Sequence, residues 1–206
     1  GTVRHEISVD GRQGARAEIR QRLVGPHQVE VDIRVQSEHL QHLVQHLPVL
    51  RRWYGTTDNP LRTAAVQRFP LIEGAMYWPY INHAWPMEKR LAVIDQHYRL
   101  LHGPAAIIAT ATLADVALAI PQVEYAGLKL VLEKAPWFLR EGEIVLSLFV
   151  ADERLYSVAF TLGLEDGQTT AYIGALQGRN LPNAMEIYRD ITHALHGMRP
   201  RDFLLY

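Results

Sequence analysis

Alternating hydrophobic and polar positions dominate the second half of the chain. From residue 125 onward, four segments follow a period of two: LKLVLEKA, EIVLSLFV, LYSVAFTLGL and TAYIGALQG. This alternation, rich in β-branched and aromatic residues, predicts β-strands. The connections between the four segments are short, and short links join antiparallel neighbours. The pattern therefore predicts an antiparallel meander of four or more strands.

A weaker form of the same alternation opens the chain. The stretch HQVEVDIRV alternates apolar and charged residues, and the dipeptides Asp10-Gly11 and Gly25-Pro26 are turn signals. We therefore expect three strands in a meander before residue 36. Ser37 is a good N-cap and favours the start of a helix immediately after them.

Helical periodicity follows in three regions farther along. Pro86 suits the first turn of a helix that runs to about Leu101. A second helix is expected over residues 105–118 and a third from about Asn183 to a stop at Gly197. An apolar element then begins near residue 199, and residues 55–70 are expected to be irregular. Helices packed on an antiparallel meander give the α+β fold class.

The pattern favours a division of the chain into two parts. Residues 1–54 form an N-terminal meander plus helix, and residues 55–206 form a larger α+β domain. The polar, proline-containing stretch near residues 55–70 is the best seam, and a single domain is the alternative.

Composition removes several classes of function. The chain has no cysteine, which excludes disulfides, thiolate catalysis and cysteine-based metal sites. A net charge of −1 gives no electrostatic case for DNA binding. No signal-peptide pattern and no apolar run long enough to span a bilayer is visible, so a cytoplasmic location is expected. The sequence does not fix the oligomeric state.

Three histidines at helical spacing raise the question of a metal site. His39, His42 and His46 recur at helical spacing, and the last two could share a metal ion. No acidic third ligand stands at a suitable position. We interpret these imidazoles as a polar stripe beside a leucine face, and no metal site is predicted.

A charged cluster precedes the strand EIVLSLFV. Arg140, Glu141 and Glu143 surround Gly142 where this strand begins. We interpret the cluster as a site rim in which Arg140 binds an anionic part of the substrate and one of the carboxylates acts as a catalytic base. The alternative is a charged turn with a local ion pair worth less than about 1 kcal/mol.

A second candidate site follows the last strand. Gln177, Gly178, Arg179 and Asn180 connect this strand to the next helix. Glycine at a strand end marks a bulge or a close approach, and a helix start after a glycine loop binds anions. The segment lacks the lysine of a phosphate-binding loop and the dinucleotide fingerprint. We predict a cofactor-binding role for these four residues, with an ordinary bulge as the alternative.

The end of the third helix supplies a third candidate. His193 and His196 share one helix face, and Arg199 follows the stop at Gly197. The two histidines could serve as an acid–base pair, and Arg199 could bind substrate. The alternative is that these residues complement the helix dipole. The chain has no Gly-x-Ser-x-Gly motif, so a serine hydrolase has no support.

Four segments, together with the earlier stretch YWPYINHAWPMEKRLAVIDQHYRLL, carry a resemblance to a known family. REGEIVLSLF, LYSVAFTL, YIGALQG and ITHALHGMRPRDFLL together resemble the VirK/YbjX family, a bacterial family without an agreed reaction. The resemblance covers residues 76–206, with Trp78 where the family usually has arginine and His193 where it often has lysine. It implies a link to virulence and to envelope integrity.

The order of elements is also similar to the GNAT acyltransferase fold. In that fold, the turn after the fourth strand and the next helix hold the pyrophosphate of an acyl carrier. This analogy implies an enzyme that transfers an acyl or aminoacyl group to an amine-bearing small molecule or envelope component. The donor would be acyl-CoA or another acyl carrier, with tRNA only in that role. The alternative is a non-enzymatic binding factor for envelope integrity or virulence.

The enzyme hypothesis carries a spatial expectation. Glu143 at the strand start, Gly178 after the last strand and the imidazole of His196 should converge on one hollow.

Overall fold

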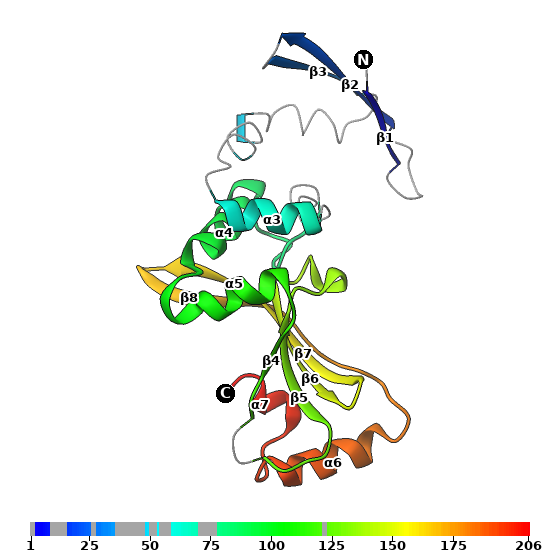
Figure 1. Cartoon of the computed structure of the whole chain (residues 1–206), viewed down its shortest axis with the longest axis vertical. Helices are drawn as coiled ribbons and strands as arrows, with labels where there is room; N and C mark the ends of the chain where they lie inside the picture. The colour runs from blue at the N-terminus through cyan, green and yellow to red at the C-terminus, as the bar shows by residue number, and fades with distance from the viewer. Residues whose placement is uncertain are drawn as a thin grey trace. The chain divides into compact units, whose positions relative to one another are not determined.

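The computed structural model describes residues 3–8, 16–25, 28–35, 48–49, 53, 59–69, 78–120 and 123–206. The chain divides into two compact units, Gly1–Thr56 and Thr57–Tyr206, drawn in Figure 1 from blue to red.

The first unit contains one three-stranded antiparallel sheet with the order β1-β2-β3. Its strands are β1 (Val3–Ser8), β2 (Arg16–Gly25) and β3 (Gln28–Val35). The expected N-terminal meander is therefore confirmed. Asp10-Gly11, Pro26, Ser37 and the histidines His39, His42 and His46 lie outside the described residues.

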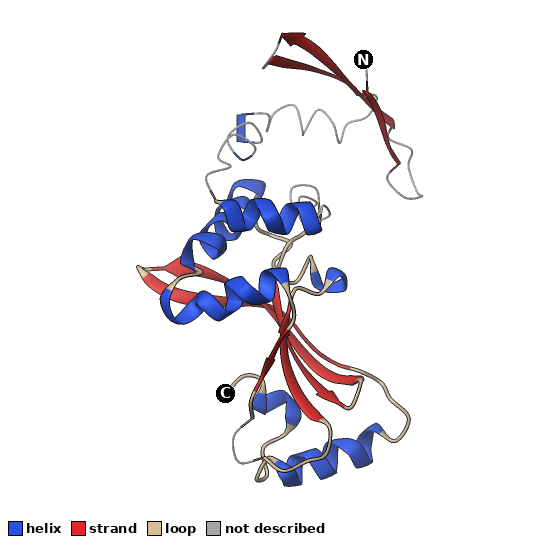
Figure 2. Cartoon of the chain, in the orientation of Figure 1, coloured by secondary structure: helices blue, strands red, loops and turns tan. Residues whose placement is uncertain are grey.

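The second unit is built on a five-stranded antiparallel sheet whose strands follow the chain in sequential order, β4-β5-β6-β7-β8. Figure 2 shows its strands in red and the helices in blue. The strands are β4 (Val116–Leu118), β5 (Leu128–Glu133), β6 (Ile144–Val150), β7 (Glu153–Glu165) and β8 (Gln168–Gly178). The α+β class and the predicted meander are confirmed, because the four predicted strands correspond to β5–β8.

Helices and 3-10 turns complete this unit. They are α3 (Pro60–Arg68), α4 (Met87–Leu100), η2 (Gly103–Ala105), α5 (Ala106–Leu113), η3 (Pro136–Phe138), α6 (Ala184–Ala194) and α7 (Pro200–Phe203). The predicted helices near residues 86–101 and 183–197 are confirmed as α4 and α6.

Two predictions about local structure were wrong. Helix α3 forms where we expected irregular chain, because the Asn59 side chain accepts a hydrogen bond from the Arg62 N–H and Pro60 suits the first turn. The helix predicted over residues 105–118 ends at Leu113. Beyond it the chain turns into β4, where Val116 pairs with Leu132 of β5.

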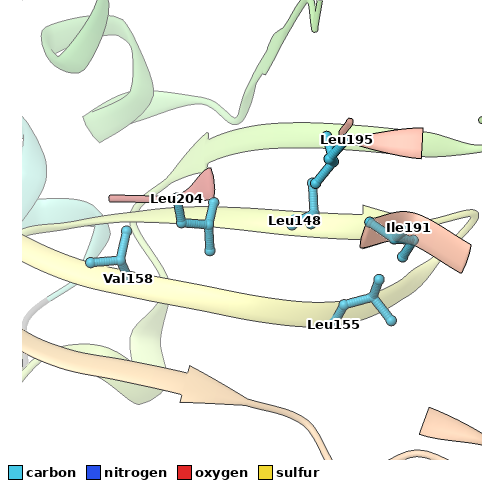
Figure 3. Packing of buried hydrophobic residues seen from close by; sticks show 6 residues of the cluster. All are labelled: Leu148, Leu155, Val158, Ile191, Leu195 and Leu204. Carbon is cyan, nitrogen blue, oxygen red and sulfur yellow. The ribbon is translucent and has the colours of Figure 1, made fainter. Parts of the chain in front are cut away.

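One face of the sheet carries the largest hydrophobic cluster. Leu148 of β6 and Val158 of β7 are buried against Ile191 of α6, against Leu195 directly after α6 and against Leu204 (Figure 3). Helix α5 covers the same face farther along, where its Ala111 packs against Leu132 and Ile144. The three helices α5, α6 and α7 therefore share this face.

The opposite face of the sheet is more polar. Ser147 and Ser157 are cross-strand partners, both are buried, and their hydroxyl groups hydrogen-bond at 2.9 Å. Gln177 of β8 lies opposite Ser157 and shares this face. Phe138 of η3 packs beside them against Val145 and Ala159.

Two glycines allow the segment after η3 to cross the sheet at close range. A Cβ atom on Gly142 would lie 2.5 Å from the backbone nitrogen of Phe160, and one on Gly174 would lie 2.0 Å from the carbonyl oxygen of Glu141. Neither position accepts a side chain without movement of the backbone. The absence of a side chain at Gly142 and at Gly174 therefore lets the segment lie directly against β7 and β8.

Candidate functional site

Two small hollows adjoin Trp137 of η3, whose side chain is 61% exposed. The first has a volume of about 170 Å³, and its lining includes Trp137, Arg154, Ser157, Gln177, Gly178 and Arg179. The second has a volume of about 140 Å³ and is lined by Trp78, Pro136, Trp137, Leu139, Arg140 and Glu141. We call them the Arg154 hollow and the Glu141 hollow, and together the Trp137 groove.

Stacking against aromatic rings positions the guanidinium of the Arg154 hollow. The Cζ atom of Arg154 lies 4.4 Å from the ring centre of Trp137 and 5.3 Å from that of Phe149. Its Nη2 donates to Glu133 Oε1 at 2.7 Å. In the described part of the chain, Arg154 Nε is buried and has no hydrogen-bond partner. The Glu133 carboxylate thus fixes Nη2 of the guanidinium, while the Nε–H of Arg154 keeps its hydrogen-bonding capacity.

At the rim of the same hollow, Arg179 makes an exposed ion pair. Its Nη1 donates to Glu153 Oε2 at 2.9 Å, and both side chains are largely solvated. Such a pair contributes at most about 1 kcal/mol, so an anionic ligand can replace Glu153 at low cost.

The Glu141 hollow combines opposite charges with two indole rings. The guanidinium of Arg140 stacks over Trp78 at 5.0 Å from the ring centre. Among the residues that the structure describes, Glu141 Oε2 and Trp78 Nε1 are buried atoms without a hydrogen-bond partner. Unpaired buried polar atoms are rare in folded proteins, because each costs about 1–3 kcal/mol.

These unpaired atoms are concentrated in the groove. Among the described residues, such side-chain atoms occur on Trp78, Arg90, His97, Glu141 and Arg154. Trp78, Glu141 and Arg154 belong to residues that line the two hollows. The groove therefore retains both donor and acceptor capacity for a ligand.

Glu143 lies in a closed network away from the groove. Its side chain is 2% exposed and its Oε2 lies 2.7 Å from Lys134 Nζ, which is equally buried. Lys134 also donates to the Glu143 carbonyl oxygen at 2.9 Å. Tyr98 donates to Oε2 at 2.7 Å and Tyr80 to Oε1 at 3.1 Å. Every charged atom of this pair is satisfied by the protein.

The network controls the protonation of its members. Burial alone raises the pKa of Glu143, but the charge of Lys134 and the hydrogen bonds from Lys134 and Tyr98 outweigh burial and lower this pKa below its ordinary value. Burial and then the charge of Glu143 raise the pKa values of Tyr80 and Tyr98. The carboxylate is therefore ionised and the phenols are neutral, which is a structural arrangement.

His97 is a neutral neighbour of this network. The side chain is fully buried, and its Nδ1 accepts a hydrogen bond from the Leu162 N–H at 3.1 Å. Burial lowers the pKa of His97 to about 4. The proton of the neutral ring therefore sits on Nε2, because Nδ1 is the acceptor.

The structure brings together five of the residues selected from sequence. Arg140 and Glu141 line one hollow, Gln177, Gly178 and Arg179 line the other, and Trp137 borders both. Asn180 is exposed on the loop after β8, outside the set of lining residues.

The expected convergence on a single hollow was wrong. Gly178 pairs with Tyr156, and Tyr156 with Leu148, five residues along β6 from Glu143, which is about 17 Å. His193, His196 and Arg199 are exposed near the α6–α7 connection, and these helices pack on the other face of the sheet. Alternation along β7 sends Ser157 to the groove and Val158 to the α6 side, so the two groups are separated by the sheet.

The start of α6 gives an anion little support. Asn183 precedes the helix in the left-handed conformation, with φ of 59°, and its carbonyl accepts from the N–H groups of Glu186 and Ile187. The carboxylate of Glu186 in the first turn also competes with any anion for the positive end of the helix dipole.

Sequence reasoning missed several members of the groove and the network. Trp137 lies in η3 and Arg154 near the start of β7, and their only signals in the sequence were an aromatic residue after Pro136 and a charge beside a strand. Lys134 was also missed, because a lysine directly after a strand is ordinarily exposed to solvent. No group of three or more potential metal-ligating His, Asp or Glu side chains occurs among the described residues. No helix in the described ranges is long and apolar enough to cross a membrane.

A comparison with protein families matches residues 34–206 to a family described as a protein of unknown function, DUF535. The chain belongs to the DUF535 family. The DUF535 match begins at the end of β3, well before residue 76, where the sequence resemblance begins. The Trp137 groove and the Glu143 network both lie inside the DUF535 region. No curated protein and no solved structure matches the chain.

Proposed function

We propose that the DUF535 domain binds a small molecule in the Trp137 groove and transfers an acyl or aminoacyl group to an amine. The observation that carries the proposal is the concentration of unpaired buried polar atoms there: Trp78 Nε1, Glu141 Oε2 and Arg154 Nε. Polar groups inside a small cavity beside aromatic walls are typical of ligand sites.

The Arg154 hollow suits the donor. Arg154 and Arg179 supply guanidinium groups, Ser157 a hydroxyl and Gln177 an amide. These groups donate hydrogen bonds to phosphate oxygens, which acyl-CoA and an acylated tRNA both carry. The exposed ring of Trp137 offers a flat surface for stacking of a base.

The Glu141 hollow suits the acceptor. The amine nitrogen would attack the carbonyl carbon of the donor, so that a C–N bond forms while the C–S or C–O bond to the carrier breaks. The substrate ammonium would first release one proton to water, and Glu141 would then take the proton that the amine loses on attack and pass it to the leaving group, which regenerates the carboxylate. Glu141 is the suitable base, because the carboxylate of Glu143 is buried in an ion pair with Lys134.

Carrier binding and transfer can be tested separately. Saturation with the correct donor among acetyl-CoA, a long-chain acyl-CoA and an aminoacyl-tRNA should stabilise the protein by about 2–3 kcal/mol at 100 times Kd, measured as a rise in Tm. Arg179→Gln should weaken this shift. Glu141→Gln should keep the shift and reduce transfer to an amine by about 100-fold or more.

The matched control is Glu186→Gln, because Glu186 is exposed in the first turn of α6 on the other face of the sheet. It should leave both measurements unchanged. A panel without any carrier-dependent shift, or a Glu141→Gln variant with the wild-type transfer rate, would contradict the proposal.

A non-enzymatic binding factor is the second candidate, and the size of the hollows favours it. Volumes of about 170 Å³ and 140 Å³ fall below the 300–1,000 Å³ or so of most small-molecule sites. This candidate includes the role in envelope integrity or virulence that the VirK/YbjX resemblance implies. It predicts that Glu141→Gln leaves the cellular phenotype intact, whereas a transferase predicts its loss.

A further inference from the structure

The two charges of the Glu141 hollow do not neutralise each other. Arg140 and Glu141 are adjacent in sequence, yet they form no ion pair with one another or with any other charged group in the described ranges. Both line the same hollow of about 140 Å³. An exposed cation and a partly buried anion thus line one small space, and neither has an ion-pair partner among the described residues.

Neighbouring contacts hold both groups in place. The Arg140 guanidinium rests on the Trp78 ring, which limits its side-chain freedom. The carbonyl of Glu141 lies against Gly174, where even a Cβ atom would come within 2.0 Å of it. The Arg140 guanidinium and the backbone of Glu141 are therefore restrained before a ligand binds, which lowers the entropic cost of association.

A ligand with a single charge matches this space poorly. An anion would pair with Arg140 but would face the carboxylate of Glu141, and a cation would meet the reverse problem. With an anion alone, the buried Oε2 atom of Glu141 keeps no partner, and with a cation alone the exposed guanidinium of Arg140 stays in solvent and adds nothing to binding. A ligand with both charges close together satisfies both groups.

We infer that the Glu141 hollow recognises a zwitterion, with its primary ammonium at Glu141 and its anionic group at Arg140. A free α-amino acid and O-phosphoethanolamine share this chemistry. The hollow takes only the charged end, and the rest of the ligand extends along Trp137. The inference rests on the proposed function, since it names the class of amine that accepts the transferred group.

Ligand analogues that each lack one charge provide the test. Tryptophan fluorescence of the whole protein would be titrated with L-phenylalanine, with N-acetyl-L-phenylalanine, which lacks the ammonium, and with L-phenylalaninamide, which lacks the carboxylate. O-phosphoethanolamine forms a separate arm with its N-acetyl derivative. At least one zwitterion should bind, and its analogues should bind at least about tenfold more weakly.

Two variants assign each charge to its residue. Glu141→Gln should weaken the zwitterion by about tenfold or more and abolish the discrimination against the N-acetyl analogue. Arg140→Gln should instead abolish the discrimination against the amide. Arg189→Gln is the control, because Arg189 is exposed on α6, and it should change neither affinity.

The pattern of binding identifies the ligand class. Binding of phenylalanine alone identifies an amino acid, and binding of O-phosphoethanolamine alone identifies a phosphoryl group beside the amine. Equal binding of the single-charge analogues, or no zwitterion binding up to about 10 mM, overturns the inference. The carrier-dependent Tm shift is independent of this result. If the carrier-dependent Tm shift persists while no zwitterion binds, the inference has failed and the proposed function stands. If a zwitterion binds while no carrier shifts the Tm, the proposed function has failed and the zwitterion site stands.

Discussion

At the scale of single residues, the buried pair of Glu143 and Lys134 shows what a charge needs in a protein interior. Each ion loses its hydration, and the loss is offset only because both are fully hydrogen-bonded at short range. Removal of one partner from such a pair costs about 3–5 kcal/mol. The pair also joins Tyr80 and Tyr98 to the start of β6, so that it fixes distant segments to one another.

His97 makes the stability of the fold dependent on pH. The unfolded chain protonates this imidazole near pH 6.5, whereas the folded protein does so only near pH 4. Its contribution to stability is therefore fully present above about pH 6.5 and is lost as the pH falls toward 4. Urea unfolding should show a free energy of unfolding about 3 kcal/mol lower at pH 4 than at pH 7 from this group.

The lowered pKa of Glu143 adds a loss in the same direction at the acidic end. In His97→Gln the decrease between pH 7 and pH 4 should be smaller, since an amide does not titrate and its oxygen can still accept from the Leu162 N–H. Gln96 already accepts in this way from the Leu164 N–H. Equal acid sensitivity in variant and wild type would show that His97 is not the responsible group.

At the scale of elements, side chains of helix α4 accept backbone hydrogen bonds from the part of β7 that has no β6 partner. Strand β7 extends past the start of β6, and its freed N–H groups at Leu162 and Leu164 donate to His97 and Gln96 of α4. These side chains replace the missing strand and cover an exposed edge, which would otherwise invite pairing with another chain.

The crossing of the segment after η3 over β8 gives a sharp prediction. Gly174→Ala places a methyl group against the Glu141 carbonyl oxygen, and the backbone must move to admit it. We expect a loss of about 1–3 kcal/mol in the free energy of unfolding, measured by chemical denaturation, together with weaker ligand binding at Glu141.

Gly167→Asn in the β7–β8 turn is the matched control. Gly167 has φ of 77° and no atom within 4 Å of an added Cβ, and asparagine tolerates this conformation. Its stability should stay within about 0.5 kcal/mol of wild type. A Gly174→Ala variant as stable as this control would mean that the crossing is not tightly packed.

At the scale of the whole molecule, we propose that residues 57–206 are an independently folding domain. Both the Glu143 network and the Trp137 groove lie entirely inside this unit. A fragment of these residues should unfold in one cooperative transition and should keep the acid sensitivity of the full chain, measured by circular dichroism. A fragment without a cooperative transition would show that residues 34–56 of the DUF535 region are needed for folding.

The sequence by itself determined most of the local elements. Period-two alternation specified β5–β8, and helical spacing specified α4 and α6, because both signals come from residues close together in the chain. Helix α3 could also have been predicted, since Asn59 and Pro60 are typical of a helix N-terminus, although we interpreted them as a turn. The absence of cysteine needed no structure to interpret.

Only the tertiary structure decided which charged residues face a ligand. Glu141 and Glu143 are two positions apart in one cluster, yet one lines a hollow and the other is buried with Lys134, Tyr80 and Tyr98. The partners of Glu143 come from segments up to 63 residues away. Local patterns report what a residue prefers, whereas burial and pairing depend on what distant segments bring against it.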